Sequence, residues 1–114
     1  MKGERVRSKS EKIIADALER EDIPYRYEYP VCLSGDLYIY PDFMVLNKRT
    51  RKEYFLEHFG MMDNPEYAEK MIRKIEEFEK NGIFPGEKLL MTFETRNRPL
   101  NTTVFEKIIQ EFFL

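Results

Sequence analysis

The sequence predicts a single α/β domain in which a mixed β-sheet is flanked by helices. Segments with helical and strand-like spacing of apolar residues follow one another in the order αβββαβ, and a further helix follows. Short turns join the first three strands, which favours antiparallel pairing, whereas the fourth strand comes after a crossover helix. The 114 residues show no linker or internal repeat and suffice for one hydrophobic core.

The N-terminal half is expected to contain one helix and three strands. The helix is predicted over residues 8–21 by an apolar stripe of Ile13, Ile14, Ala17 and Leu18. Ser8 and Glu11 have the spacing of a capping box at its start, and Pro24 follows its end. The strands are expected over residues 25–33, 37–46 and 52–59, with turns at 34–36 and at the basic segment 47–51.

The C-terminal half is expected to contain two helices and one strand. A helix over residues 66–81 ends at Asn81 and Gly82 and buries a stripe of Tyr67, Met71, Ile75 and Phe78, flanked by Ala68 and Ile72. Residues 88–94 form a short apolar strand. Asn101 or Thr102 caps the last helix, whose apolar residues are Val104, Phe105, Ile108, Ile109, Phe112 and Phe113.

Composition excludes several classes of protein. The chain is 42% hydrophobic and 14% aromatic, as folded globular proteins are. Cys32 and His58 are its only cysteine and histidine, so an internal disulfide and a Cys/His zinc site are impossible. Cys32 is expected in the core. No apolar run reaches the length of a membrane span and the N-terminus is charged, so a soluble, cytoplasmic protein without membrane contact is expected.

Basic residues gather in two runs, although the net charge is −2. The first run is Lys2, Arg5, Arg7, Lys9 and Lys12, and the second is Lys48, Arg49, Arg51 and Lys52. The ordinary interpretation of such runs is a solvated surface. The alternative is contact with the phosphates of a nucleic acid.

The second and third strands are expected to bring two acids together. If their turn is centred between Arg49 and Thr50, Asp42 lies directly opposite Glu57, with Cβ atoms about 5 Å apart. Two carboxylates that close repel each other unless a cation lies between them, and a hard divalent ion suits their oxygens. Pro41 would interrupt the strand just before Asp42. The plainer alternative is two exposed, unrelated acids.

Two further side chains fall near this region. Lys74 lies at the edge of the buried stripe of the second predicted helix, with Lys70 further out and Arg73 on the opposite side. Lys74 either extends its ammonium group to solvent or reaches a phosphate. Glu11 either completes the helix cap or projects inward beside Ile14.

Four segments in this order resemble motifs of the PD-(D/E)xK (restriction-endonuclease-like) nuclease superfamily, which has an αβββαβ core. They are Arg7-Ser8-Lys9-Ser10-Glu11, Tyr40-Pro41-Asp42-Phe43, Glu57-His58-Phe59-Gly60-Met61-Met62-Asp63 and the helix of residues 67–74. They are similar to segments of largely uncharacterised bacterial and phage proteins, and related Glu-His-x-Gly segments occur in nuclease-like modules attached to some helicases. The resemblance covers nearly the whole chain.

The resemblance implies a metal-dependent nuclease site. Asp42 and Glu57 would bind Mg²⁺ or Mn²⁺, with the backbone carbonyl of His58 as a third ligand. Glu11 would orient a water at the ion, or the ion itself. The metal would lower the pKa of a water and polarise the phosphate. Phosphate contacts would come from Arg7, Lys9, Lys48, Arg49, Arg51, Lys52 and Lys70.

The sequence departs from the superfamily at one position. The motif lysine is expected two residues after the second acid, where this chain has Phe59. Three interpretations follow: the lysine has migrated to the second helix as Lys74, with Lys70 in reserve; the site binds metal but cuts poorly; or catalysis is lost. The inward position of Lys74 favours migration. His58 is expected to be a packed or supporting residue rather than a general base.

The leading hypothesis is therefore a nuclease that hydrolyses DNA phosphodiester bonds. The alternative is a non-catalytic nuclease-like module that binds or positions nucleic acid, and a purely structural domain is the third class. Domains of this kind are commonly embedded in longer proteins, which is compatible with an excised domain. Cutting two strands often needs two sites, which is compatible with a homodimer.

Overall fold

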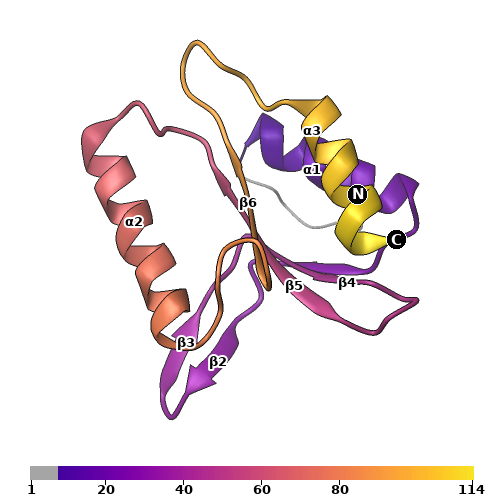
Figure 1. Cartoon of the computed structure of the whole chain (residues 1–114). Helices are drawn as coiled ribbons and strands as arrows, with labels where there is room; N and C mark the ends of the chain where they lie inside the picture. The colour runs from indigo at the N-terminus through magenta and orange to yellow at the C-terminus, as the bar shows by residue number, and fades with distance from the viewer. Residues whose placement is uncertain (1–7) are drawn as a thin grey trace.

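The computed structural model, which describes residues 8–114, has helices and strands in the predicted segments, except that two of the predicted strands are each divided in two (Figure 1). The first half contains α1 (Lys9–Arg20), β1 (Tyr25–Tyr27), β2 (Val31–Ser34), β3 (Leu37–Ile39), β4 (Phe43–Leu46) and β5 (Glu53–Phe59). The second half contains α2 (Pro65–Lys80), β6 (Leu89–Phe93), α3 (Thr102–Ile108) and a π-helical continuation of α3, η1 (Ile109–Phe113).

Four strands form the mixed sheet that the sequence predicts, in the order β1-β4-β5-β6. Antiparallel pairing joins β1 to β4 and β4 to β5, whereas β6 lies parallel to β5. The helix α2 is the crossover between the parallel strands β5 and β6. A parallel connection must bring the chain back to the end of the sheet at which the first strand began. The mixed sheet flanked by helices confirms the predicted α/β fold class.

Two of the predicted strands are each broken in two, which corrects the expected ranges 25–33 and 37–46. β1 ends near Glu28, whose φ of 49° lies outside the extended region, and Pro30 follows. Pro41 separates β3 from β4, since proline has no N–H for the ladder. The freed halves, β2 and β3, pair with each other as a separate antiparallel hairpin.

The helices cover opposite faces of the sheet. Figure 1 shows α1 and α3 together on one side and α2 on the other, above the β2–β3 hairpin. The first core lies under α1 and α3 and includes Ile14, Leu18, Phe43, Leu56, Phe105 and Ile109. The second core lies under α2 and consists of Ile39, Phe55, Phe78, Ile83 and Leu89. Phe55 and Leu56 are neighbours on β5 but enter different cores, because side chains alternate along a strand.

Side-chain caps fix the helix starts. The hydroxyl oxygen of Ser8 accepts a hydrogen bond from the N–H of Glu11 at 3.1 Å, as the capping-box spacing predicts. Asn64 caps α2 and Asn101 caps α3 in the same way, by accepting from the N–H of Tyr67 and of Val104. Gly82, with a φ of 80°, follows α2 at the predicted stop.

Several predictions of burial are wrong. Cys32, expected in the core, is exposed on the β2–β3 hairpin, and its thiol donates to the carbonyl of Gly35. Of the stripe that α2 is predicted to bury, Phe78 is buried, whereas Tyr67, Met71 and Ile75 are half-buried. Among residues 8–114, no helix combines the length and the apolar composition that a membrane crossing requires.

Candidate functional site

Asp42 and Glu57 lie against each other at the point where β4 begins. The register pairs Phe43 with Leu56 and Met44 with Phe55, which is the predicted register and puts the two acids at the next opposed positions. The N–H of Asp42 donates to Oε2 of Glu57 at 2.5 Å, and the N–H of His58 donates to Oδ2 of Asp42 at 2.8 Å. The two carboxylates thus continue the contact between the strands after Pro41 has ended the backbone ladder.

Burial and mutual repulsion make the negative charges of this pair costly. Glu57 is fully buried, and its loss of hydration, together with the charge of Asp42, raises its pKa to about 7. Burial also raises the pKa of Asp42, although the hydrogen bond from the His58 N–H opposes the shift. The site therefore has a strong demand for positive charge, as the paired-acid prediction requires.

Lys74 supplies positive charge from α2. Its ammonium group forms an ion pair with Oε1 of Glu57 and donates a hydrogen bond of 3.3 Å to the carbonyl of Tyr40. The side chain of Lys74 is 25% exposed, so it reaches inward from the helix edge rather than extending to solvent. Arg73 points away and pairs with Glu69 on the surface, as predicted.

Glu11 projects inward from the first turn of α1. Only 8% of the residue is exposed, and its carboxylate accepts a hydrogen bond from the hydroxyl of Tyr27 at 2.8 Å. Tyr27 in turn packs against Phe43, with ring centroids 5.3 Å apart. Both alternatives for Glu11 hold in part, since its N–H serves the cap while its carboxylate faces the interior.

His58 belongs to a buried polar chain on the α1 side of β5. Its Nδ1 contacts the hydroxyl of Thr92 and its Nε2 contacts Oε1 of Glu94, each at 2.7 Å. The hydroxyl of Ser10 donates to the same oxygen of Glu94. These bonds hold the ring of His58 in place and join β6 to α1, which agrees with a packed, supporting histidine.

Sequence reasoning missed Glu94, Ser10 and the hydroxyl of Tyr67. Helical periodicity predicts Tyr67 only as part of the apolar stripe of α2, whereas in the structure its hydroxyl accepts a hydrogen bond from the N–H of Gly60, and burial raises its pKa. A signal for Glu94 existed, because it is the last residue of the predicted strand 88–94, which forms β6 and pairs in parallel with β5. The C-terminal ends of two neighbouring parallel strands lie at the same end of the sheet, so residues at the ends of β5 and β6 come close together.

An open cleft of about 1170 Å³ extends over these residues. Its walls come from the start of α1, from β3 and Asp42, from the end of β5 and from the inner face of α2. Three lysines and four acids line it: Lys9, Lys70, Lys74, Glu11, Glu28, Asp42 and Glu94. Since the acids are in excess and Glu57 lies buried beside them, an anionic ligand needs an added cation to bind here.

The structure does not bring the second basic run to this cleft. The turn of residues 47–52 lies at the far end of the β4–β5 hairpin from Asp42. There Lys48 pairs with Asp22 at 2.7 Å, and the Arg49 guanidinium donates to the carbonyl of Leu114 at 3.0 Å. Arg51 and Lys52 are exposed at the same turn. Arg7 lies outside the described residues, whereas Lys9 and Lys70 line the cleft.

The donor atoms suit magnesium better than a metal that needs a full set of protein ligands. Oε1 of Glu57 is buried and, within residues 8–114, accepts no hydrogen bond; its contact there is the Lys74 ion pair. No group of three or more His, Cys, Asp or Glu side chains in that range is placed to hold a metal. Mg²⁺ is often bound through one or two carboxylates, while water and substrate phosphates complete its shell. A Mg²⁺ or Mn²⁺ ion held by Asp42 and Glu57 would therefore need water or substrate oxygens to complete its shell.

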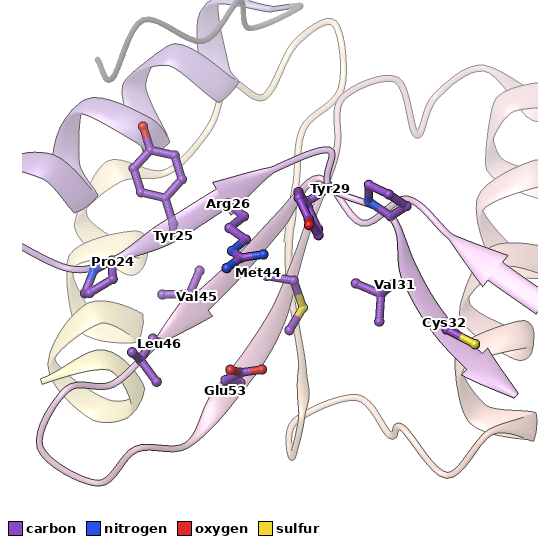
Figure 2. A pocket seen from close by; sticks show the side chains of 11 residues that line it. Pro24, Tyr25, Arg26, Tyr29, Val31, Cys32, Met44, Val45, Leu46 and Glu53 are labelled. Carbon is purple, nitrogen blue, oxygen red and sulfur yellow. The ribbon is translucent and has the colours of Figure 1, made fainter.

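A second pocket, of about 530 Å³, lies between the open face of β1 and β4 and the start of β2 (Figure 2). The guanidinium of Arg26 lies over the ring of Tyr29, 4.5 Å from its centroid. Arg26 and Glu53 are the charged residues of its lining. This pocket has no pair of acids, so the cleft at Asp42 is the better candidate for chemistry.

Comparisons of the chain with protein-family models, with curated proteins and with solved structures find no match.

Proposed function

We propose that this protein is a metal-dependent nuclease that hydrolyses phosphodiester bonds of DNA at the cleft containing Asp42. The observation that carries the proposal is the convergence of two mutually repelling acids and one lysine, Asp42, Glu57 and Lys74, from three different elements. The raised pKa values of both acids support it, because such shifts gather at functional sites. The resemblance of the four motifs to PD-(D/E)xK nucleases points to the same reaction.

Each residue has a role that follows from its surroundings. The carboxylates of Asp42 and Glu57 hold Mg²⁺ or Mn²⁺, which when bound activates water and polarises the phosphate. The ammonium group of Lys74 shifts from Glu57 to a phosphate oxygen and stabilises the charge that develops there. Glu11, held by Tyr27, orients the attacking water. Lys9 and Lys70 attract the phosphate backbone along the cleft.

The reaction is an ordinary hydrolysis. The water gives up a proton to solvent as its oxygen forms a bond to phosphorus, the bond from phosphorus to the leaving sugar oxygen breaks, and that oxygen takes up a proton from solvent. Lys74 replaces the lysine that the superfamily pattern expects at the position of Phe59. Its contact with Glu57 supports the migrated-lysine interpretation over the loss of catalysis.

A non-catalytic binding module is the second candidate. Phe59 favours it, because this residue occupies the position where the superfamily pattern has its catalytic lysine. Such a module would keep its affinity for nucleic acid and metal without turnover.

The test is cleavage of supercoiled plasmid and of single-stranded DNA with Mg²⁺ or Mn²⁺, with Asp42→Ala purified in parallel. Cutting by the parent protein and not by the variant supports the nuclease. Asp36→Ala is a matched control, because Asp36 is an exposed acid in the β2–β3 turn. If the parent does not cut but binds DNA in the presence of metal, the binding module replaces the nuclease. If Asp42→Ala cuts as fast as the parent, the site is elsewhere.

A further inference from the structure

Two tyrosines on the β2–β3 hairpin are more exposed than large aromatic side chains usually are. Tyr38 is 58% exposed and Tyr40 is 59% exposed, whereas Ile39 between them is buried in the second core. The alternation of side chains along β3 explains this, since anchoring the hairpin through Ile39 turns both neighbours outward. Within residues 8–114 neither tyrosine ring stacks on another aromatic ring.

Both tyrosines line the same cleft as Asp42. The carbonyl of Tyr40 accepts a hydrogen bond from Lys74, so the backbone beneath the ring is tied to the acid pair. Met61, another half-exposed apolar residue, lines the cleft as well. The cleft thus combines exposed aromatic and apolar surface with the ammonium groups of Lys9 and Lys70.

This combination matches the chemistry of a nucleic acid strand with unpaired bases. Proteins bind single strands through cationic side chains along the backbone and aromatic side chains on which bases stack. In a duplex the bases are stacked on one another and present only their edges in the grooves, so a tyrosine ring has no free base face to cover. Phosphate contact alone would need the lysines and not the tyrosines.

We infer that the cleft selects single-stranded DNA or single-stranded segments, with bases stacked on Tyr38 and Tyr40 beside the phosphate at Asp42. This inference rests on the proposed nuclease function, because it names the substrate class of the same site. Stacking on every base is similar, so little sequence preference is expected. The expected preference is for unpaired strands over the same strands in a duplex.

The experiment measures binding of three fluorescent probes by anisotropy, with Ca²⁺ in place of Mg²⁺ to slow cleavage. The probes are a short single strand, that strand annealed to its complement, and a strand of the same length without bases. The parent protein should bind the single strand about tenfold more tightly than the other two. Tyr38→Ala and Tyr40→Ala should each weaken single-strand binding about tenfold, whereas Tyr38→Phe and Tyr40→Phe should restore it, since phenylalanine also stacks.

Tyr29→Ala is the matched control, because Tyr29 is 50% exposed but lines the other pocket. Its single-strand affinity should equal that of the parent.

Equal affinity for single strand and duplex, or tyrosine variants that bind like the parent, would overturn the inference while leaving the proposed nuclease activity intact. Binding that depends on the tyrosines without cleavage in Mg²⁺ would overturn the nuclease and keep the inference. Absence of binding to all three probes would overturn both.

Discussion

The ammonium group of Lys74 forms an ion pair with Oε1 of Glu57, so the most deeply buried acid of the site already has a counter-charge. This oxygen is also one that a divalent ion bound between Asp42 and Glu57 would approach. In the proposed function, lysine and metal would compete for this carboxylate oxygen, and binding of the ion would release the lysine toward a phosphate. Mutation of Lys74 can therefore separate its proposed contact with phosphate from the proposed binding of metal by Asp42 and Glu57.

Lys74→Met should reduce DNA cleavage by about 100-fold, because it removes the positive charge beside the reacting phosphate. The affinity for Mn²⁺, measured by calorimetry, should stay the same or rise, since the competing ammonium group is gone. Arg73→Met is the control, because Arg73 is a cation of the same helix that pairs with Glu69 on the surface and does not line the cleft. Unchanged cleavage by Lys74→Met would transfer the role to Lys70 or to no lysine.

Asp42→Asn should abolish Mn²⁺ binding and leave the protein at least as stable as the parent without metal. The amide oxygen of asparagine can still accept the hydrogen bond from the His58 N–H, while the repulsion with Glu57 disappears. Calorimetry with Mn²⁺ and thermal unfolding in a chelator measure the two effects. A large loss of melting temperature without metal would contradict the paired-acid description.

The stability of the metal-free protein should fall as pH rises between about 4.5 and about 7. Folding raises the pKa of Glu57 from 4.5 to about 7, so in this range the folded state holds a proton that the unfolded chain has lost. The free energy of unfolding then decreases with rising pH. In Glu57→Gln this contribution is absent, so urea midpoints of parent and variant should diverge in favour of the variant from about pH 5 to about pH 8. If the difference between the urea midpoints of parent and variant does not change over this pH range, folding does not raise the pKa of Glu57.

Single-strand binding should depend on the lysines of the cleft and not on the turn between β4 and β5. Lys9→Ala and Lys70→Ala should weaken binding and lower the slope of log affinity against log salt by about 1 each, because each removes one phosphate contact. Arg51→Ala and Lys52→Ala should leave both quantities unchanged, since the turn lies at the other end of the hairpin. If Arg51→Ala or Lys52→Ala weakens binding, the basic turn between β4 and β5 is part of the DNA-binding surface after all.

Local sequence rules predicted the pairing of the acids correctly because one tight turn fixes the register of a hairpin. The turn at Arg49 and Thr50 was enough to put Asp42 opposite Glu57. Helical periodicity likewise placed Lys74 at the inner edge of α2, although it could not choose between solvent and site. That choice depends on the distance between α2 and the sheet, which a periodic pattern does not contain.

The errors have a common physical origin in contacts between distant segments. Pro30 and Pro41 were visible in the sequence, but not the separate pairing of β2 with β3 that follows from them. Cys32 was judged by its usual burial, whereas the detached hairpin leaves it exposed. The bond between Glu94 and His58 depends on the parallel alignment of β5 and β6, which joins residues far apart in the chain.

The position of β5 between two cores has a consequence for the timing of motions in this protein. β5 is paired on both edges and sends Phe55 to one core and Leu56 to the other, so its amides can open to hydrogen exchange only when both cores come apart. The β2–β3 hairpin, a two-stranded sheet anchored through Ile39, can open far more often. We therefore expect Glu57 and His58 to exchange slowly with β5, and Tyr38 and Tyr40, which line the same cleft as His58, to exchange faster with the hairpin. If the cleft binds DNA as proposed, this difference would let the hairpin move as a DNA strand enters or leaves while Asp42 and Glu57 keep their geometry.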